Sequence, residues 1–266
     1  MTQQSNPLIG PPPPEVPLPN APLVRVIAQV SFPSILRLQE QEFIAPFQEA
    51  IRKTYPNLQQ EKVQGLSIGP QGIAPGFQQF AWRFSDFDGK WRVSITPDFL
   101  AIETTSYTSR SDFFSRLRFV LDEFNMHAEP AGVLRLGVRY IDRVIGTSQS
   151  ELTSLVRSEV LGVIGTSLSE HLQLSVTETL FSLPGSNDQI HARWGMVPAL
   201  ATVDPNAIEP IDETSWVLDL DMFSTEKHSF VPEEIEKTAR RYAERIYSVF
   251  RWAVTDDFLR QFGGRP

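Results

Sequence analysis

The sequence predicts an α+β protein in which internally duplicated β-α-β-β-β-α units form a curved antiparallel sheet with helices on one face. Three observations support this prediction. Short segments alternate apolar and polar residues as half-buried strands do, one dipeptide signals a hairpin, and the same order of elements occurs twice along the chain. The expected parts are a disordered proline-rich tail at 1–22, a first half at 23–130 and a second half at 131–266, with both halves in one continuous domain.

The first half begins with a strand at 23–30, where β-branched residues are frequent. Apolar residues then recur at helical spacing over 43–51 and predict the first helix. Asp88-Gly89 lies between two alternating segments and favours a type I′ hairpin. A second helix is expected after Ser109 or Ser111, because either residue can cap it. The strands between the two helices are expected at 80–84, 91–95 and 99–105.

The second half has the same predicted order of elements. It begins with a strand at 134–140, which is followed by a helix to about residue 160 with a capping box formed by Ser148 and Glu151. A long helix starts near Pro232, and Thr255 caps a short terminal helix. The strands between the first helix and the long helix are expected at 171–183, 189–197 and 216–223.

Residues 1–22 contain eight prolines, including the run from Pro11 to Pro14, and they show no apolar periodicity. Such a segment is expected to be extended and disordered, with polyproline II character. The simplest interpretation is a solvated tail. The alternative is a docking motif for a proline-binding partner.

Composition excludes several classes of function. The chain contains no cysteine, which rules out disulfides, cysteine-based metal sites and thiol catalysis, and fits a reducing cytoplasm. No apolar stretch approaches the roughly 20 residues of a membrane helix, and the beginning of the chain lacks the pattern of a signal peptide. The net charge of -8 argues against a surface tuned as a whole to nucleic acid. We therefore expect a cytoplasmic protein without membrane association, and we predict no cofactor.

Strand alternation sorts the side chains of four predicted strands onto two faces. One face is apolar, and the other carries arginines, whose guanidinium groups can hold carboxylate or phosphate through paired donors. The alternative is that these arginines pair across strands with Glu103, Asp142 or Glu178, or only keep the face soluble. The candidate ligand-binding residues are Arg25, Arg83, Arg92, Arg135, Arg139 and Arg143.

Asp219 and Asp221 alternate with apolar residues in the strand predicted at 216–223, so both carboxylates project from the same face. Two carboxylates at this spacing can hold a hard cation, as in sites of phosphoryl transfer. The alternative is that they pair with the arginine face. No third acidic ligand, phosphate loop or catalytic lysine can be placed beside them, so we assign neither a catalytic residue nor a metal ligand.

Three segments resemble those of a known family. They are Pro22-Leu23-Val24 followed by Phe32-Pro33, residues 99–104 leading into Tyr107 and Phe113, and residues 135–142. From Leu23 onward the chain resembles a sporadically distributed family of bacterial proteins of uncharacterised function. The resemblance implies no catalytic residues. The patchy distribution of such a family implies mobile loci, including phage-defence and toxin–antitoxin cassettes.

The leading interpretation is a non-enzymatic binding or interaction module. Its arginine-lined sheet face would hold an anionic small ligand or an acidic segment of a protein partner. One alternative is a metal-dependent enzyme acting on nucleotides or phosphodiesters, with Asp219 and Asp221 holding the metal. Another is an antitoxin or chaperone-like protein that masks a partner. The sequence leaves a homodimer open, and it leaves nucleic acid open as a partner without favouring it.

Overall fold

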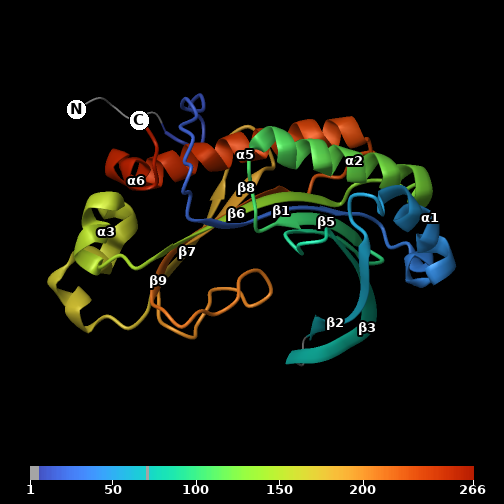
Figure 1. Cartoon of the computed structure of the whole chain (residues 1–266), viewed down its shortest axis with the longest axis horizontal. Helices are drawn as coiled ribbons and strands as arrows, with labels where there is room; N and C mark the ends of the chain where they lie inside the picture. The colour runs from blue at the N-terminus through green and yellow to red at the C-terminus, as the bar shows by residue number, and fades with distance from the viewer. Residues whose placement is uncertain (1–5, 70–71) are drawn as a thin grey trace. The chain divides into compact units, whose positions relative to one another are not determined.

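A computed structural model describes residues 6–69 and 72–266, with the side chains of 62–79 outside the description. The described residues confirm the α+β class, with nine strands in one antiparallel sheet of hydrogen-bonded order β2-β3-β4-β5-β1-β6-β9-β8-β7 (Figure 1). Two compact units can be distinguished, and β1 and β6 contribute residues to both. Unit 1 comprises the described residues up to Val26 together with Val138–Ser224 and Arg241–Pro266, and unit 2 comprises Ile27–Gly137 and Thr225–Arg240.

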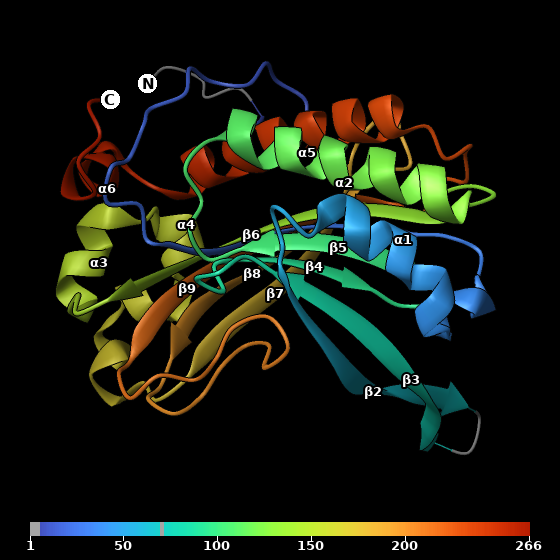
Figure 2. The same cartoon turned by 45° about the vertical axis from the view of Figure 1, so that its right-hand side comes forward.

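Unit 2 contains the strands β2 to β5, most of β1, and the helices α1 and α2. The bounds are β1 Leu23–Ser31, the 3-10 helix η1 Leu36–Gln39, α1 Gln41–Ile51, β2 Asn57–Gly69, β3 Gly72–Ser85, β4 Trp91–Ile95, β5 Phe99–Thr104 and α2 Arg110–Ala128. The strand β3 pairs with β4 only over Trp82–Ser85, so β2 and β3 continue beyond β4 as a two-stranded ribbon (Figure 2).

The buried face of these strands is the apolar face that alternation predicts. Phe84, Val93 and Ile102 are cross-strand neighbours, and all three are fully buried. The ring of Phe47 in α1 packs on Phe84 with the centroids 5.6 Å apart, and Phe113 in α2 packs on Trp91 at 5.7 Å. Both helices therefore cover the same face of unit 2, opposite to the face that carries Arg83 and Arg92.

The hairpin predicted at Asp88-Gly89 is present, but its turn is not the two-residue type I′. The strands end at Ser85 and resume at Trp91, and of the predicted pair only Gly89 has a positive φ, of 66°. A type I′ turn requires positive φ at both positions. The carboxylate of Asp86 accepts hydrogen bonds from the backbone N–H groups of Lys90 at 2.8 Å and Trp91 at 3.1 Å, so this side chain closes a longer turn.

Unit 1 contains β6 to β9, the short helices that follow β6, and the C-terminal helices. The bounds are β6 Arg135–Ile145, α3 Gln149–Leu155, α4 Ser158–Leu161, the 3-10 helices η2 Gly162–Gly165 and η3 Ser167–His171, β7 Ser175–Ser182, β8 Gln189–Val197, β9 Ser215–Ser224, α5 Pro232–Ala253 and α6 Asp256–Gln261. The first turns of α5, up to Arg240, belong to unit 2.

Capping chemistry defines the start of α3 as predicted. The Ser148 hydroxyl accepts from the N–H of Glu151, and the Glu151 carboxylate accepts from the N–H of Ser148 at 2.7 Å, which completes the capping box. The helix ends at Leu155, earlier than the predicted residue 160. It ends there because Val156 adopts an extended backbone and forms an isolated β-bridge with Val254.

The register of unit 1 sorts its side chains by face. Ala192 lies opposite Leu220, and both are buried on the apolar face. The buried Tyr242 of α5 donates a hydrogen bond from its hydroxyl to Asp188 at 2.6 Å. On the opposite face Arg193 lies directly across from Asp219, which brings charged side chains of neighbouring strands together.

The two predicted halves have similar but not identical orders of elements. In residues 23–130 the first helix is followed by four strands, and in 131–266 the helices after β6 are followed by three. The additional strand is β2, which apolar alternation does not predict. In both halves the first strand pairs with the last and the others follow in reverse order, β1-β5-β4-β3-β2 and β6-β9-β8-β7. The internal duplication therefore stays a prediction.

The described part of the N-terminal segment, residues 6–22, forms hydrogen bonds with α5 and with the residue that follows α6. None of the described helices combines the length and the apolar composition that a membrane span requires.

Candidate functional site

The six predicted arginines are divided equally between the units. Arg83, Arg92 and Arg135 belong to unit 2. In that unit Arg83 pairs with Glu61 at 3.2 Å and donates to the hydroxyl of Ser94, while Arg92 pairs with Glu103. The last pairing is one that the alternative interpretation predicts.

Arg135 is the first residue of β6, and its side chain extends over Gly137 of the same strand. A Cβ added at Gly137 would lie 2.5 Å from the Nη1 atom of Arg135, so the glycine provides the space that the guanidinium group occupies. A larger residue at position 137 would force this side chain to move.

Arg25, Arg139 and Arg143 belong to unit 1. Arg25 lies on β1 and is partly buried. Arg139 and Arg143 both reach the loop between β8 and β9, residues 198–214, which we call the β8–β9 loop. The Nη2 of the buried Arg143 donates to the backbone carbonyl of Glu209 at 2.8 Å, and burial lowers the pKa of its guanidinium group. The structure therefore brings two of the predicted residues to the same loop.

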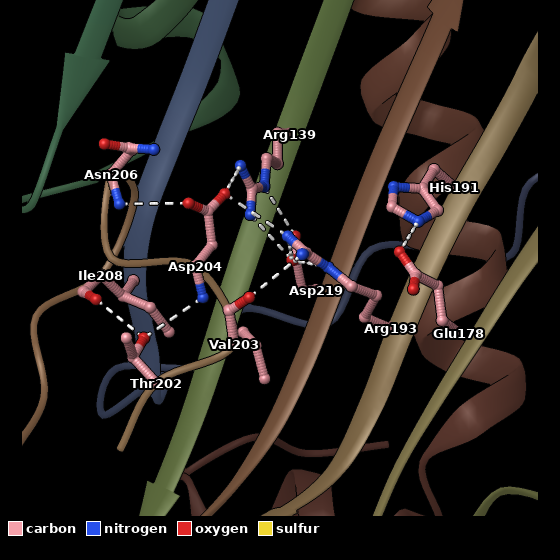
Figure 3. Close-up of polar contacts among 10 residues, drawn as sticks. All are labelled: Arg139, Glu178, His191, Arg193, Thr202, Val203, Asp204, Asn206, Ile208 and Asp219. Carbon is pink, nitrogen blue, oxygen red and sulfur yellow. Dashed lines mark hydrogen bonds and ion pairs between the residues drawn. The ribbon is translucent and has the colours of Figure 1, made fainter. Parts of the chain in front are cut away.

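Arg139 belongs to a cluster of four charged side chains, which Figure 3 shows. The cluster consists of Arg139 on β6, Arg193 on β8, Asp219 on β9 and Asp204 in the β8–β9 loop, and we call it the arginine–aspartate cluster. Only Asp204 comes from a loop. The other three side chains are on neighbouring strands, which orient them rigidly.

Asp219 is the centre of this cluster. Its Oδ1 and Oδ2 accept from the Nε and Nη2 of Arg139, both at 2.8 Å, in a bidentate pair. Its Oδ2 also accepts from the Nε and Nη2 of Arg193 at 3.0 and 2.7 Å. The side chain of Asp219 is only 2% exposed. One buried carboxylate therefore shares its negative charge between the positive charges of two guanidinium groups.

Asp204 completes the cluster from the solvent side. Its Oδ2 accepts from the Nη1 of Arg139 at 2.9 Å and lies 3.5 Å from the Nη2 of Arg193. Burial opposes ionisation of this carboxyl, but the hydrogen bond and charge of Arg139 outweigh burial and lower the pKa of Asp204. Burial likewise opposes the charge of Arg139, and its two carboxylate partners raise the pKa of this guanidinium group.

The β8–β9 loop holds Asp204 in place through its own backbone. The hydroxyl of Thr202 donates to the carbonyl of Ile208 at 2.8 Å, and the carboxylate of Asp204 accepts from the N–H of Asn206 at 3.1 Å. Arg193 donates to the carbonyl of Val203 at 3.1 Å, so both cluster arginines contact this loop. Long loops without secondary structure in compact domains are often functional.

Sequence alternation missed Arg193 and Asp204. Arg193 lies inside the strand predicted at 189–197. Its role in the cluster depends on strand register, which places it opposite Asp219 on β9 and opposite Glu178 on β7. Glu178 itself pairs with His191 at 2.6 Å, and among the described residues it has no arginine partner. The sequence signal for Asp204 is an acidic residue in a long loop that follows an arginine-bearing strand. This signal does not show where the loop runs, so it does not identify the partners of Asp204.

The sequence predicts that Asp219 and Asp221 share a face and either hold a cation or pair with arginine. The structure confirms arginine pairing for Asp219. Among the residues that the structure describes, no group of three or more His, Asp or Glu side chains is placed to hold a metal ion. The donor set around Asp219 consists of guanidinium groups, whose positive charge opposes a cation.

The geometry is suited to holding a planar anion, because two guanidinium groups converge on the place that the Asp204 carboxylate occupies.

No protein-family model matches the chain, and no curated protein matches it.

Proposed function

We propose that this chain is a non-enzymatic, cytoplasmic binding module, and that the arginine–aspartate cluster holds a carboxylate or phosphate of an anionic ligand or of an acidic partner segment. One observation carries the proposal. The carboxylate of Asp204, a loop residue, lies between two arginines borne on strands. In this proposal an external anion takes its place.

Charge balance explains why the place of Asp204 is the binding site. The cluster contains two guanidinium groups and two carboxylates and is therefore neutral. Asp219 is buried on a strand, but Asp204 is 21% exposed and belongs to a loop. When Asp204 moves away, the remaining three side chains carry a net positive charge. An incoming anion then restores neutrality with the same donors.

The test replaces Asp204 with asparagine, which keeps an oxygen acceptor for the N–H of Asn206 but removes the competing charge. Charge-assisted hydrogen bonds contribute about 1.5–3 kcal/mol, so affinity for an anionic probe should rise about tenfold or more. The measurement is calorimetric titration of the full chain with a hexaglutamate peptide and, separately, with inorganic phosphate. The stronger of the two probes identifies the class of anion.

Asp212→Asn is the matched control, because Asp212 is exposed in the same loop. It changes the charge of the loop equally and should leave affinity unchanged. Adding Arg193→Gln to Asp204→Asn should abolish the gain. An unchanged affinity in Asp204→Asn, together with reduced thermal stability, would show that the cluster only holds the β8–β9 loop in position and does not bind an anion.

A second candidate function, the masking of a partner protein, is favoured by the strand β7. This strand ends the sheet, and side chains on it and just before it are exposed, namely Leu174 at 59%, Val176 at 40% and Leu180 at 57%. An edge strand with exposed apolar residues is a template for an added strand.

If this edge binds a partner, a protein should co-purify with the full chain at fixed stoichiometry. Leu180→Lys should remove that protein, because a charge on the edge opposes strand addition. Asp204→Asn should retain it. The reverse pattern would assign the partner to the arginine–aspartate cluster. The phage-defence or toxin–antitoxin setting implied by the family resemblance remains a prediction.

A further inference from the structure

The N-terminal segment of unit 1 lies beside α5 and α6 in both views (Figures 1 and 2). Between Gly10 and Pro17 only Gly10, Pro13 and Val16 are partly buried, and the residues between them are exposed. This period of three is the repeat of a polyproline II helix. One edge of the segment therefore faces the protein, and the other edges face solvent.

Two side chains of α5 provide polar contacts to this segment. The Nη1 of Arg245 donates to the backbone carbonyls of Pro7 at 2.7 Å and Gly10 at 2.8 Å. The hydroxyl of Tyr247 donates to the carbonyl of Pro14 at 3.3 Å and accepts from the N–H of Val16 at 2.8 Å. All four contacts are to main-chain atoms of the segment. Arg245 contacts the turn at its start, where the N–H groups of Ile9 and Gly10 donate to the carbonyl of Asn6 at 3.2 and 2.8 Å, and Tyr247 contacts the polyproline II stretch that follows.

Ring stacking and close packing accompany these polar contacts. The ring of Tyr247 stacks on Phe250 with the centroids 6.1 Å apart. Beyond α6, the N–H of Asn20 donates to the carbonyl of Phe262 at 3.2 Å. A Cβ added at Gly264 would lie 2.6 Å from Leu18, so the glycine permits the close approach of the two chain segments.

An aromatic surface with donors aimed at backbone carbonyls is how proteins recognise proline-rich segments. A polyproline II helix has no internal hydrogen bonds, so its carbonyls are available, and its preformed shape reduces the entropy lost on binding. We propose that the surface formed by Arg245 and Tyr247, with Phe250 stacked on the Tyr247 ring, binds a proline-rich segment in which a turn precedes a polyproline II stretch. In this proposal the chain's own residues 7–17 occupy this surface, and a proline-rich segment of another polypeptide can replace them.

Two features support replacement. The contacts recognise the main chain and not particular side chains, so another proline-rich segment with the same backbone shape can make them. They also lie at the surface, where local opening costs little free energy. The tethered segment competes at an effective concentration in the range of about 1 mM, which explains why a free peptide would bind the unmodified chain weakly.

The experiment weakens the tethered segment without altering the binding surface. In the full chain, Pro12→Gly and Pro13→Gly together increase the freedom of the released segment. A fluorescent peptide with the sequence of residues 6–20 is then added, and binding is followed by fluorescence anisotropy. We expect saturable binding, tighter than to the unmodified chain. Adding Tyr247→Phe and Arg245→Gln to this background should weaken binding at least about tenfold, because the four contacts are lost.

Arg260→Gln is the control, because Arg260 is 60% exposed on α6 and pairs only with Asp257 among the described residues. It should leave peptide binding unchanged. If the combined variant melts early, Tyr247→Phe alone, which keeps the shape of the ring, should still weaken binding. Absence of saturable binding to the Pro12→Gly, Pro13→Gly chain would overturn the proposal, as would binding that Tyr247→Phe and Arg245→Gln leave unchanged.

Discussion

Replacing Asp219 with alanine is expected to lower the free energy of unfolding by about 3–5 kcal/mol, the cost of removing one partner from a buried ion pair. The reason is that two guanidinium groups, those of Arg139 and Arg193, would lose their shared buried carboxylate. Asp204 could compensate only one of them. The measurement is urea denaturation of the full chain at neutral pH, with the m-value as a check on two-state behaviour.

Asp221→Ala is the matched control for this prediction. Asp221 lies two residues further along the same strand and on the same face, but it is partly exposed. A partly exposed charge contributes little, so the expected loss is at most about 1 kcal/mol. Equal losses for Asp219→Ala and Asp221→Ala would contradict the central role of Asp219. Neutralising all four side chains of the arginine–aspartate cluster together should recover part of the lost stability, because no unpaired charge of the cluster remains buried.

Replacing Asp142 with asparagine is expected to stabilise the protein, and more strongly at high pH. Asp142 is buried on β6, and burial raises the pKa of its carboxyl from 3.8 to about 7. A carboxyl with a raised pKa binds a proton more tightly in the folded state. The stability of the unmodified protein therefore falls as pH rises from about 4 to about 7, and the full cost is present above pH 7.

The size of the pH-dependent gain in stability follows from the difference in proton binding between the folded and unfolded states. Between pH 5 and pH 7 the folded state retains the Asp142 proton that the unfolded chain has lost. At about 1.4 kcal/mol for each pH unit, the gain from Asp142→Asn should be about 3 kcal/mol larger at pH 8 than at pH 5. Denaturation curves at both pH values measure it, with the exposed Asp212→Asn as control. A gain that does not change with pH would show that Asp142 ionises in the folded protein as in the unfolded chain.

Local patterns predict local structure well in this chain. Alternation places β4 at 91–95 and β8 at 189–197, the bounds that the structure has. The capping side chains of Ser109 and Ser148 begin α2 and α3 as predicted. These elements follow from the sequence because their periodicity and caps involve residues close together in the chain.

Elements without such patterns depend on their partners. The strand β2 contains few alternating apolar residues, yet it pairs with β3 from Asn57 to Gly69. The predicted strand at 80–84 is only the end of β3, which begins at Gly72 and includes Pro75, a residue that alternation treats as a strand breaker. Pairing between β2 and β3 determines that β2 forms and that β3 begins at Gly72, and no local sequence pattern encodes this pairing.

The sequence by itself determines the α+β class, the apolar strand faces and the presence of arginines opposite them. Only the tertiary structure decides which charges meet. It pairs Arg92 with Glu103, gathers Arg139 and Arg193 around Asp219, and brings Asp204 from a long loop to the same place. It also places the N-terminal prolines against Tyr247. The physical reason is that periodicity orients a side chain relative to its own strand or helix, whereas a charge or hydrogen-bond partner depends on strand register and loop path, which involve residues distant in sequence.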